Sequence, residues 1–162
     1  MTRETIAIVG AEQKSGSFFA AKLIGLDEYR ILLMPGDSHI PPGDLHMPAG
    51  DMWTENEAVT CIKDGCWEAD TILLDVAGDQ EKETADKIRE VSTQKIVLIL
   101  PDAGSRYAYR ETDWDELLPT AAIVHSYGDP HQGRISISGH EKSATDKIDS
   151  LLKKLGFETV IK

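Results

Sequence analysis

Short apolar runs recur along this chain, and segments with the apolar spacing of amphipathic helices separate most of them. Such an alternation is typical of a parallel sheet that helices cover on both faces. The predicted strands are residues 5–10, 29–34, 71–78, 95–100, 121–128, 134–139 and 157–161. The predicted helices are residues 16–26, 55–69, a segment that Asp79 caps and that buries Ala85, Ile88 and Val91, and residues 141–155. We therefore expect an α/β protein with a doubly wound, mostly parallel sheet and helices on both faces.

Details of three segments sharpen this prediction. Residues 134–139 alternate apolar and polar side chains, so this strand is expected nearer an edge of the sheet. The helix over 55–69 is expected to fray at Gly65. Gly156 is expected to end the last helix. The apolar stripe of that helix consists of Ala144, Ile148, Leu151 and Leu155.

Length and charge limit the class of protein. A chain of 162 residues is expected to form one domain over residues 1–162. Asp and Glu outnumber Lys and Arg by 28 to 17, and the resulting charge of −11 repels nucleic acid and anionic membranes. We expect no signal peptide, because the first residues lack its long apolar region, and no apolar run in the sequence approaches the roughly 18 residues of a membrane span. We expect a cytoplasmic protein in which Cys61 and Cys66 are reduced thiols.

The stretch GAEQKSG, from Gly10 to Gly16, lies between the first predicted strand and the first predicted helix. A dinucleotide-binding turn needs glycine where the backbone takes a positive φ or approaches a diphosphate, and then a helix N-terminus whose free N–H groups face the anion. Gly10 and Gly16 could serve two of these needs, or could be required by the turn alone. The residues expected to bind a cofactor here are Gly10, Ala11, Glu12, Gln13, Lys14, Ser15 and Gly16.

Other polar and turn residues follow the carboxyl ends of neighbouring predicted strands, where a doubly wound sheet binds its ligands. Their shared location is the main indication of a binding site. The further cofactor-binding candidates are Met34, Pro35, Val76, Ala77 and Pro101, and the segments Asp102 to Arg106 and His125 to Gly128 follow two of these strands.

These segments together resemble the N-terminal nucleotide-binding domain of the prephenate dehydrogenase and deazaflavin-dependent NADP reductase group, in the 6-phosphogluconate dehydrogenase-like superfamily. GAEQKSG has the length of that group's G-x-x-G-x-x-G turn, DAGSR (102–106) resembles its D-x-G-S-x-K turn, and HSYG (125–128) resembles its H-P-x-x-G. Residues 137–160 resemble its closing helix and strand. The resemblance implies a Rossmann-like fold with NAD or NADP bound across the strand ends.

The resemblance also implies catalytic residues. It places Ser105 and His125 near the reacting carbon, where a neutral imidazole can accept a hydroxyl proton as hydride leaves and a serine can hold the imidazole or the substrate. The chain departs from the family pattern at Gln13, where a glycine is usual, and at Ser126, where a proline is usual. The family's helical substrate and dimer domain is expected to be absent, so an oligomer or a partner chain would complete the site.

Two functions remain open at this point. The first is an NAD(P)-dependent oxidoreductase that transfers hydride to or from an unknown small substrate, with this chain whole or as a fragment of a longer dehydrogenase. The second is a non-catalytic Rossmann-like module whose dinucleotide turn is degenerate. His125 could equally be a packed, hydrogen-bonded histidine, and Ser105 a turn residue. A metal site is not expected, because the remaining histidines lack zinc-ligand spacing: His39, His46, His131 and His140.

Overall fold

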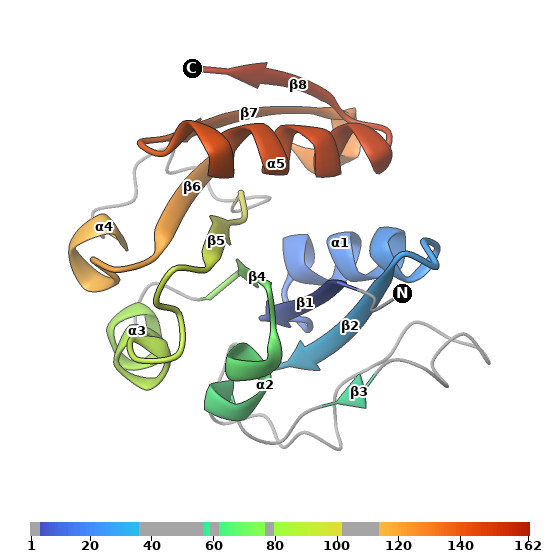
Figure 1. The fold of residues 1–162 in the computed structure, drawn as a ribbon. Coiled ribbons are helices and arrows are strands. Elements are labelled where there is room, and N and C mark those ends of the chain that lie inside the picture. Colours follow the sequence, from blue (N-terminus) through green and yellow to red (C-terminus); the bar gives the residue numbers. More distant parts are fainter. Residues whose placement is uncertain (1–3, 36–56, 59–61, 77–79, 102–113) are drawn as a thin grey trace.

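The computed structural model describes residues 4–35, 57–58, 62–76, 80–101 and 114–162 (Figure 1). These residues contain an eight-stranded sheet in the order β3-β2-β1-β4-β5-β6-β7-β8, in which only β6 and β7 pair antiparallel. The predicted mostly parallel α/β architecture is confirmed. The strands are β1 (Glu4–Val9), β2 (Tyr29–Met34), β3 (Glu57–Ala58), β4 (Thr71–Leu74), β5 (Ile96–Ile99), β6 (Ala122–Tyr127), β7 (Arg134–Gly139) and β8 (Glu158–Ile161).

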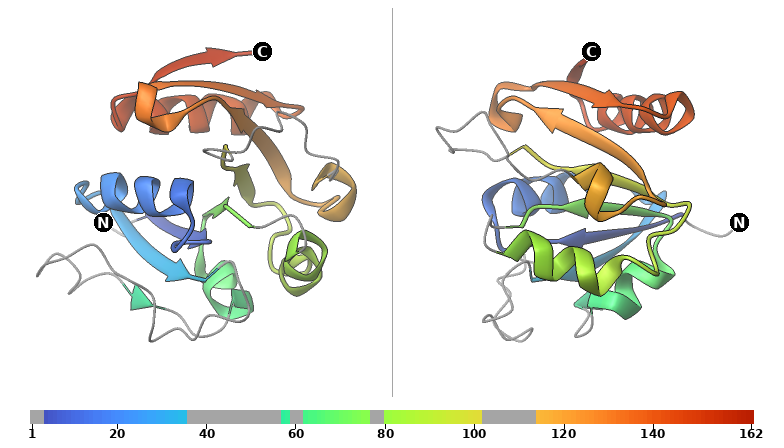
Figure 2. Two further views of the ribbon diagram at one scale, coloured as in Figure 1. Left: turned by 180° about the vertical axis from the view of Figure 1, so that it is seen from behind. Right: turned by 90° about the vertical axis from the view of Figure 1, so that its left-hand side faces the viewer.

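Helices cover both faces of the sheet, which makes the fold doubly wound and Rossmann-like (Figures 1 and 2). One face packs against α1 and α5, and the other packs against α2, α3 and α4. No helix in the described part of the chain is both long and apolar enough to cross a bilayer. The helices are α1 (Lys14–Ile24), α2 (Ile62–Glu68), α3 (Glu81–Ile88), α4 (Trp114–Leu117) and α5 (Lys142–Lys154), with a short 3-10 helix at Pro130–Gln132.

The central strands are apolar on both sides because each side lies in a separate core. In β1, Ile6 and Ile8 belong to the cluster under α1 and α5, whereas Ala7 and Val9 belong to the cluster under α2, α3 and α4. Successive strand residues point to opposite faces, so a strand covered twice needs apolar side chains at every position. This explains the unbroken apolar runs in the sequence.

The predicted helix over residues 55–69 is wrong at its beginning. Glu57–Ala58 forms β3, which pairs in parallel with Leu32 and Leu33 of β2. The helix of this segment, α2, begins only at Ile62. Backbone pairing with the free edge of β2 overrides the helical spacing of the segment. Gly65 is buried inside α2, not at a frayed end.

The end of α2 is held by Lys95, the residue directly before β5. Lys95 Nζ donates to the carbonyl oxygens of Cys66 at 2.6 Å and Trp67 at 2.5 Å. An ammonium group is favourable there, because the last carbonyls of a helix carry partial negative charge. Burial lowers the pKa of the Lys95 ammonium below its ordinary value of 10.5. Cys66 itself is a buried thiol, whereas Cys61 and the predicted cap Asp79 lie outside the described residues.

The last helix and the last strand form one unit. Gly156 has a φ of +93° directly after α5, as the predicted helix end requires, and the predicted stripe of α5 is buried. Asp149 of α5 accepts a hydrogen bond from Thr159 Oγ1 of β8, and Lys153 Nζ lies 2.8 Å from Asp149 Oδ2. The hydrogen bonds from Lys153 and then Thr159 hold the pKa of Asp149 below its ordinary value of 3.8.

A Thr159→Val substitution tests this tie between α5 and β8. Loss of the hydroxyl should cost about 1 kcal/mol of unfolding free energy at neutral pH. Since the pKa of Asp149 is lowered in the folded state, its contribution is complete above pH 3.8 and is lost as the pH falls through the lower folded value. Urea unfolding at pH 7 and at stepwise lower pH should therefore show the difference between wild type and variant shrinking. A difference that does not depend on pH would contradict a hydrogen bond between Thr159 and an ionised Asp149. Asp149→Asn is the matched control, because it removes the titrating charge and keeps an oxygen that can accept from Thr159.

Candidate functional site

The loop after β1 is shaped by its first glycine. Gly10 has a φ of +99°, and a Cβ atom there would lie 1.8 Å from the backbone oxygen of Asp75. The N–H groups of Gly10 and Ala11 both donate to the carbonyl oxygen of Met34, at 2.8 and 3.1 Å. The chain therefore turns sharply between β1 and α1, at a position where no side chain fits.

The second glycine lets α1 sit directly on this loop. Gly16 occupies the third residue of the helix, and a Cβ atom there would lie 1.9 Å from the carbonyl oxygen of Gly10. In a dinucleotide-binding turn, the last glycine has the role of allowing this close packing of helix against strand. The helix begins two residues earlier than predicted, so Gly16 lies inside its first turn.

Two backbone amides at the N-terminus of α1 have no hydrogen-bond acceptor in the described part of the chain. Gln13 is the N-cap residue, but its side chain makes no capping hydrogen bond, and its Nε2 instead donates to Glu12 Oε1 at 3.3 Å. The N–H groups of Lys14 and Ser15 donate to no residue that the structure describes. Amides at this end of a helix carry partial positive charge and attract anions.

The third amide of the helix is already taken by a carboxylate of the chain itself. Gly16 N donates to Asp75 Oδ2 at 2.9 Å, and Asp75 is 6% exposed. Asp75 follows β4 directly and is not among the predicted site residues. The sequence does hold a signal for it, because an acidic residue in the buried run TILLDV needs an internal hydrogen-bond partner.

The remaining predicted cofactor residues surround this loop in different ways. Met34 and Pro35 are buried behind it, and Val76 belongs to the apolar cluster under α2, α3 and α4. The carbonyl oxygen of Pro101, at the end of β5, accepts a hydrogen bond from Ser15 Oγ. This bond ties α1 to a strand two positions away in the sheet. Ala77 lies outside the described residues, as does the catalytic candidate Ser105.

The other catalytic candidate, His125, has an acidic partner. Its Nε2 lies 3.3 Å from Asp115 Oδ2 of α4, and the two side chains are 25% and 38% exposed. The sequence pattern around Asp115 indicates only a solvated helix start, so sequence reasoning misses this pair. The neighbouring Ser126 is buried and donates through Oγ to the carbonyl oxygen of Ile99 at 2.6 Å. No cluster of three metal-ligating side chains occurs among the described residues.

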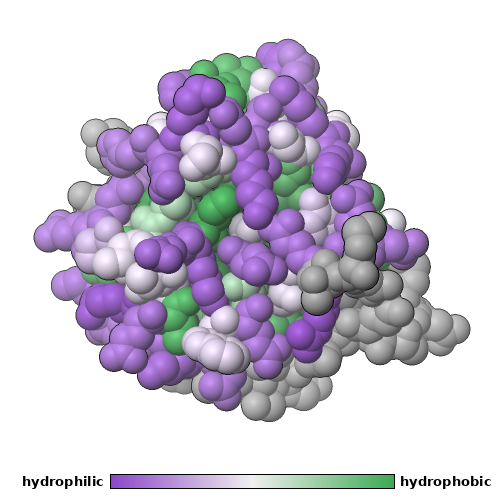
Figure 3. All heavy atoms as spheres, in the orientation of Figure 1, coloured by the Kyte–Doolittle hydropathy of each residue, from purple (hydrophilic) through white to green (hydrophobic). Residues whose placement is uncertain are grey.

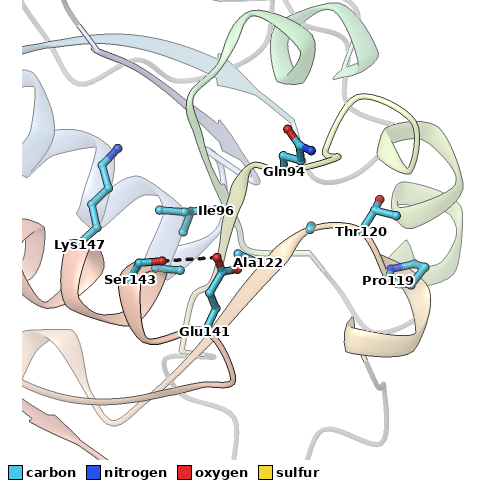
Figure 4. A pocket seen from close by; sticks show the side chains of 10 residues that line it. Gln94, Ile96, Pro119, Thr120, Ala122, Glu141, Ser143 and Lys147 are labelled. Atoms are coloured by element: carbon cyan, nitrogen blue, oxygen red, sulfur yellow. Dashed lines mark hydrogen bonds between the residues drawn. The ribbon is translucent and has the colours of Figure 1, made fainter.

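A cavity of about 610 Å³ lies at the other end of the strands, beside the amino ends of β5 and β6 (Figure 4). Its charged groups already have partners: Glu141 accepts from Ser143 Oγ at 3.4 Å, and Lys147 Nζ lies 2.8 Å from Glu4 Oε1. Figure 4 shows the Lys147 side chain extending away from Glu141. We place the candidate site at the carboxyl ends of the strands instead, because the glycine turn lies there, together with helix amides that no described residue accepts from.

No protein-family model matches the chain, and no curated protein matches it in sequence. Solved structures do share its fold. A protein assigned as an F420-dependent NADP reductase from Arthrobacter sp. FB24 matches with a TM-score of 0.71 at 19% identity, covering 96% of this chain and 82% of that one.

Two further enzymes match over about half of their own length. Pyrroline carboxylate reductase from Plasmodium falciparum, in a structure with NADP bound, matches with a TM-score of 0.66 at 11% identity, covering 100% of this chain and 58% of that one. Glycerol-3-phosphate dehydrogenase from Coxiella burnetii matches with a TM-score of 0.73 at 14% identity, covering 99% and 54%. At these identities the matches show a common Rossmann-like fold.

Proposed function

We propose that this chain binds NAD or NADP across the carboxyl edge of its sheet, with the diphosphate at the N-terminus of α1. The observation that carries the proposal is the pair of amides, Lys14 N–H and Ser15 N–H, which have no acceptor among the described residues and follow a turn whose two glycines lie directly against backbone atoms. Aligned helix amides of this kind bind phosphate without needing a positive side chain. Lys14 is exposed and adds a positive charge beside them.

The other cofactor residues follow from this position. Ala11, Glu12 and Gln13 form the loop around the diphosphate, with Gly10 and Gly16 beneath it. Met34 and Pro35 would lie toward the adenosine side, and Val76, Ala77 and Pro101 toward the nicotinamide side, because a dinucleotide crosses such a sheet at the point where strand order reverses. The order β2-β1-β4 contains that reversal. The NADP in the fold relative from Plasmodium falciparum supports the ligand class.

The oxidoreductase role is part of the same proposal. A bound nicotinamide supplies or takes up hydride, and the chain must then move a proton. His125 is our candidate for this proton transfer, because Asp115 at 3.3 Å from Nε2 orients the ring and leaves Nδ1 to meet a substrate hydroxyl. Ser105 remains a proposed partner of that histidine. The substrate is a small molecule, and an oligomer or partner chain would enclose it.

Thermal unfolding with NAD, NADP and their reduced forms tests cofactor binding directly. A ligand that binds only the folded state adds about 2.7 kcal/mol of stability at a hundredfold excess over its dissociation constant, so the midpoint should rise with at least one of the four. The substitution Lys14→Pro removes the backbone N–H group of residue 14. Proline is tolerated at the first position of a helix, and Gln13 before it has the extended φ and ψ of −77° and 164° that proline requires.

The control for this variant is Lys14→Ala, which keeps the amide and removes only the side-chain charge. We expect Lys14→Pro to fold and to bind about tenfold more weakly than Lys14→Ala, because a hydrogen bond to a charged group contributes about 1.5 kcal/mol. Gln13→Gly, which restores the family's middle glycine, should bind more tightly. A cofactor shift that all three variants leave unchanged would place the dinucleotide elsewhere.

A second function is favoured by one specific observation. The Asp75 carboxylate at the N-terminus of α1 places a negative charge beneath the proposed diphosphate, and Gln13 adds a side chain where the turn usually has none. A Rossmann-like module that binds a partner or a smaller anion would tolerate both features. The absence of any midpoint shift with all four nicotinamide nucleotides would favour this alternative.

A further inference from the structure

Strand β8 is the last strand of the sheet, and its outer side, here called the open edge, pairs with no strand that the structure describes. The N–H groups of Glu158 and Lys162 point inward, donating to Gly133 O at 2.8 Å and Ile137 O at 2.9 Å. Because backbone groups alternate in direction along a strand, the N–H and C=O groups of Thr159 and Ile161 point outward from the sheet. These outward groups form the hydrogen-bonding edge available to another strand.

Apolar side chains accompany this open edge. Val160 is 42% exposed and Ile161 is 51% exposed, and they are two of the four exposed large apolar side chains among the described residues. Figure 1 places β8 at the outermost edge, and Figure 3 shows apolar surface at the same end of the molecule. Exposed edges of this kind are normally covered or charged in monomeric proteins.

We propose that the open edge of β8 pairs with β8 of a second copy of this chain, antiparallel and centred on Val160. A two-fold axis between identical edge strands makes them antiparallel, because each residue must meet its partner reciprocally. Only registers that oppose outward-facing residues can form hydrogen bonds. With Val160 on the axis, Thr159 faces Ile161 of the partner subunit, and the two exchange both of their backbone hydrogen bonds.

Charge complementarity selects this register among the allowed ones. The strand and the residue after it read ETVIK, with a negative charge at one end and a positive charge at the other. Centring on Val160 places Glu158 opposite Lys162 of the partner subunit, and symmetry repeats the pair. Centring on Thr159 or Ile161 instead places a charged residue opposite Val160. Opposite charges facing each other across strands are stabilising.

Existing contacts leave these residues free to pair. Glu158 already lies 3.2 Å from Arg134, but both side chains are about two thirds exposed (67% and 66%), so this ion pair contributes little and can share its carboxylate. The side chain of Thr159 is held by its hydrogen bond to Asp149 of α5, which leaves its backbone groups unaffected. Strands β5, β6 and β7 separate β8 from β4, so the paired edge leaves the candidate cofactor site open in both copies.

Sedimentation velocity over a range of protein concentrations tests the assembly. We expect a reversible species of twice the 17.8 kDa chain mass. Lys162→Glu places two carboxylates opposite each other on both sides of the axis, and should weaken dimerisation on the order of tenfold. The double variant E158K/K162E restores opposite charges and should recover the dimer. A monomer at every concentration, or a double variant that stays as weak as the single one, would overturn the proposal.

A disulfide test reports the register independently of affinity. Residues opposite each other at a non-hydrogen-bonded position have Cα atoms about 4.5 Å apart, within disulfide range. Val160→Cys should therefore give a covalent dimer under mild oxidation. Lys162→Cys is the matched control, since its two copies lie at opposite ends of the paired strands and should stay unlinked. Equal crosslinking of both variants, or none at Val160→Cys, would contradict the pairing.

Discussion

Gly16→Ala should remove about 3 kcal/mol or more of unfolding free energy, a large part of the stability of a protein of this size. The added Cβ atom would lie 1.9 Å from the carbonyl oxygen of Gly10, and that atom belongs to the backbone. The helix can escape the clash only by moving away from β1, which would break its contacts with the core. Because the neighbour is not a flexible side chain, rotamer changes cannot relieve the strain.

Urea unfolding followed by circular dichroism measures this effect. The matched control is Gly25→Ala at the other end of α1, where φ is −70° and the atom nearest to an added methyl group, Lys22 O, is 3.4 Å away. We expect Gly25→Ala to change the stability by less than about 1 kcal/mol. Similar costs at the two positions would mean that α1 does not rest on the loop. A loss of cofactor binding in a Gly16 variant would be uninformative for the same reason, and Lys14→Pro is the sharper test.

Asp75→Ala should also be strongly destabilising, by about 2 to 3 kcal/mol. It leaves the buried N–H group of Gly16 without its 2.9 Å acceptor, and a hydrogen bond to an ionised carboxylate contributes more than one between neutral groups. Asp75→Asn keeps an oxygen that can accept from Gly16 and should cost clearly less. Thermal and urea unfolding of the two variants separates the hydrogen bond from the charge.

The Asp75→Asn variant also tests whether a diphosphate binds at the N-terminus of α1. If a diphosphate binds at the amides of Lys14 and Ser15, removing the negative charge beneath it should tighten the binding of NAD or NADP to Asp75→Asn. Asp27→Asn, at an exposed position before β2, makes the same change in net charge far from the loop and serves as the control. Weaker binding by Asp75→Asn would instead mean that this carboxylate contacts the ligand.

Much of the architecture is readable from residues close together in the chain. Strand β2 has its predicted ends, and β7 lies near an edge as expected, because period-two and period-3.6 patterns of apolar residues report which sides of an element are covered. The left-handed glycine after α5 is predictable for a similarly local reason. The strand β3 is not, since its pairing depends on the free edge of β2 and on nothing within residues 57–58.

The candidate site likewise has features that the sequence predicts and contacts that it does not. By itself, the sequence determined the order of the longer strands and helices and the glycine turn between β1 and α1, because periodicity and glycine geometry are properties of neighbouring residues. Only the tertiary structure brought the Asp75 carboxylate to the amide of Gly16, Pro101 to Ser15, and Asp115 to His125. Each of these contacts joins separate elements of the fold, and its energy depends on burial and distance, which exist only once the sheet has formed.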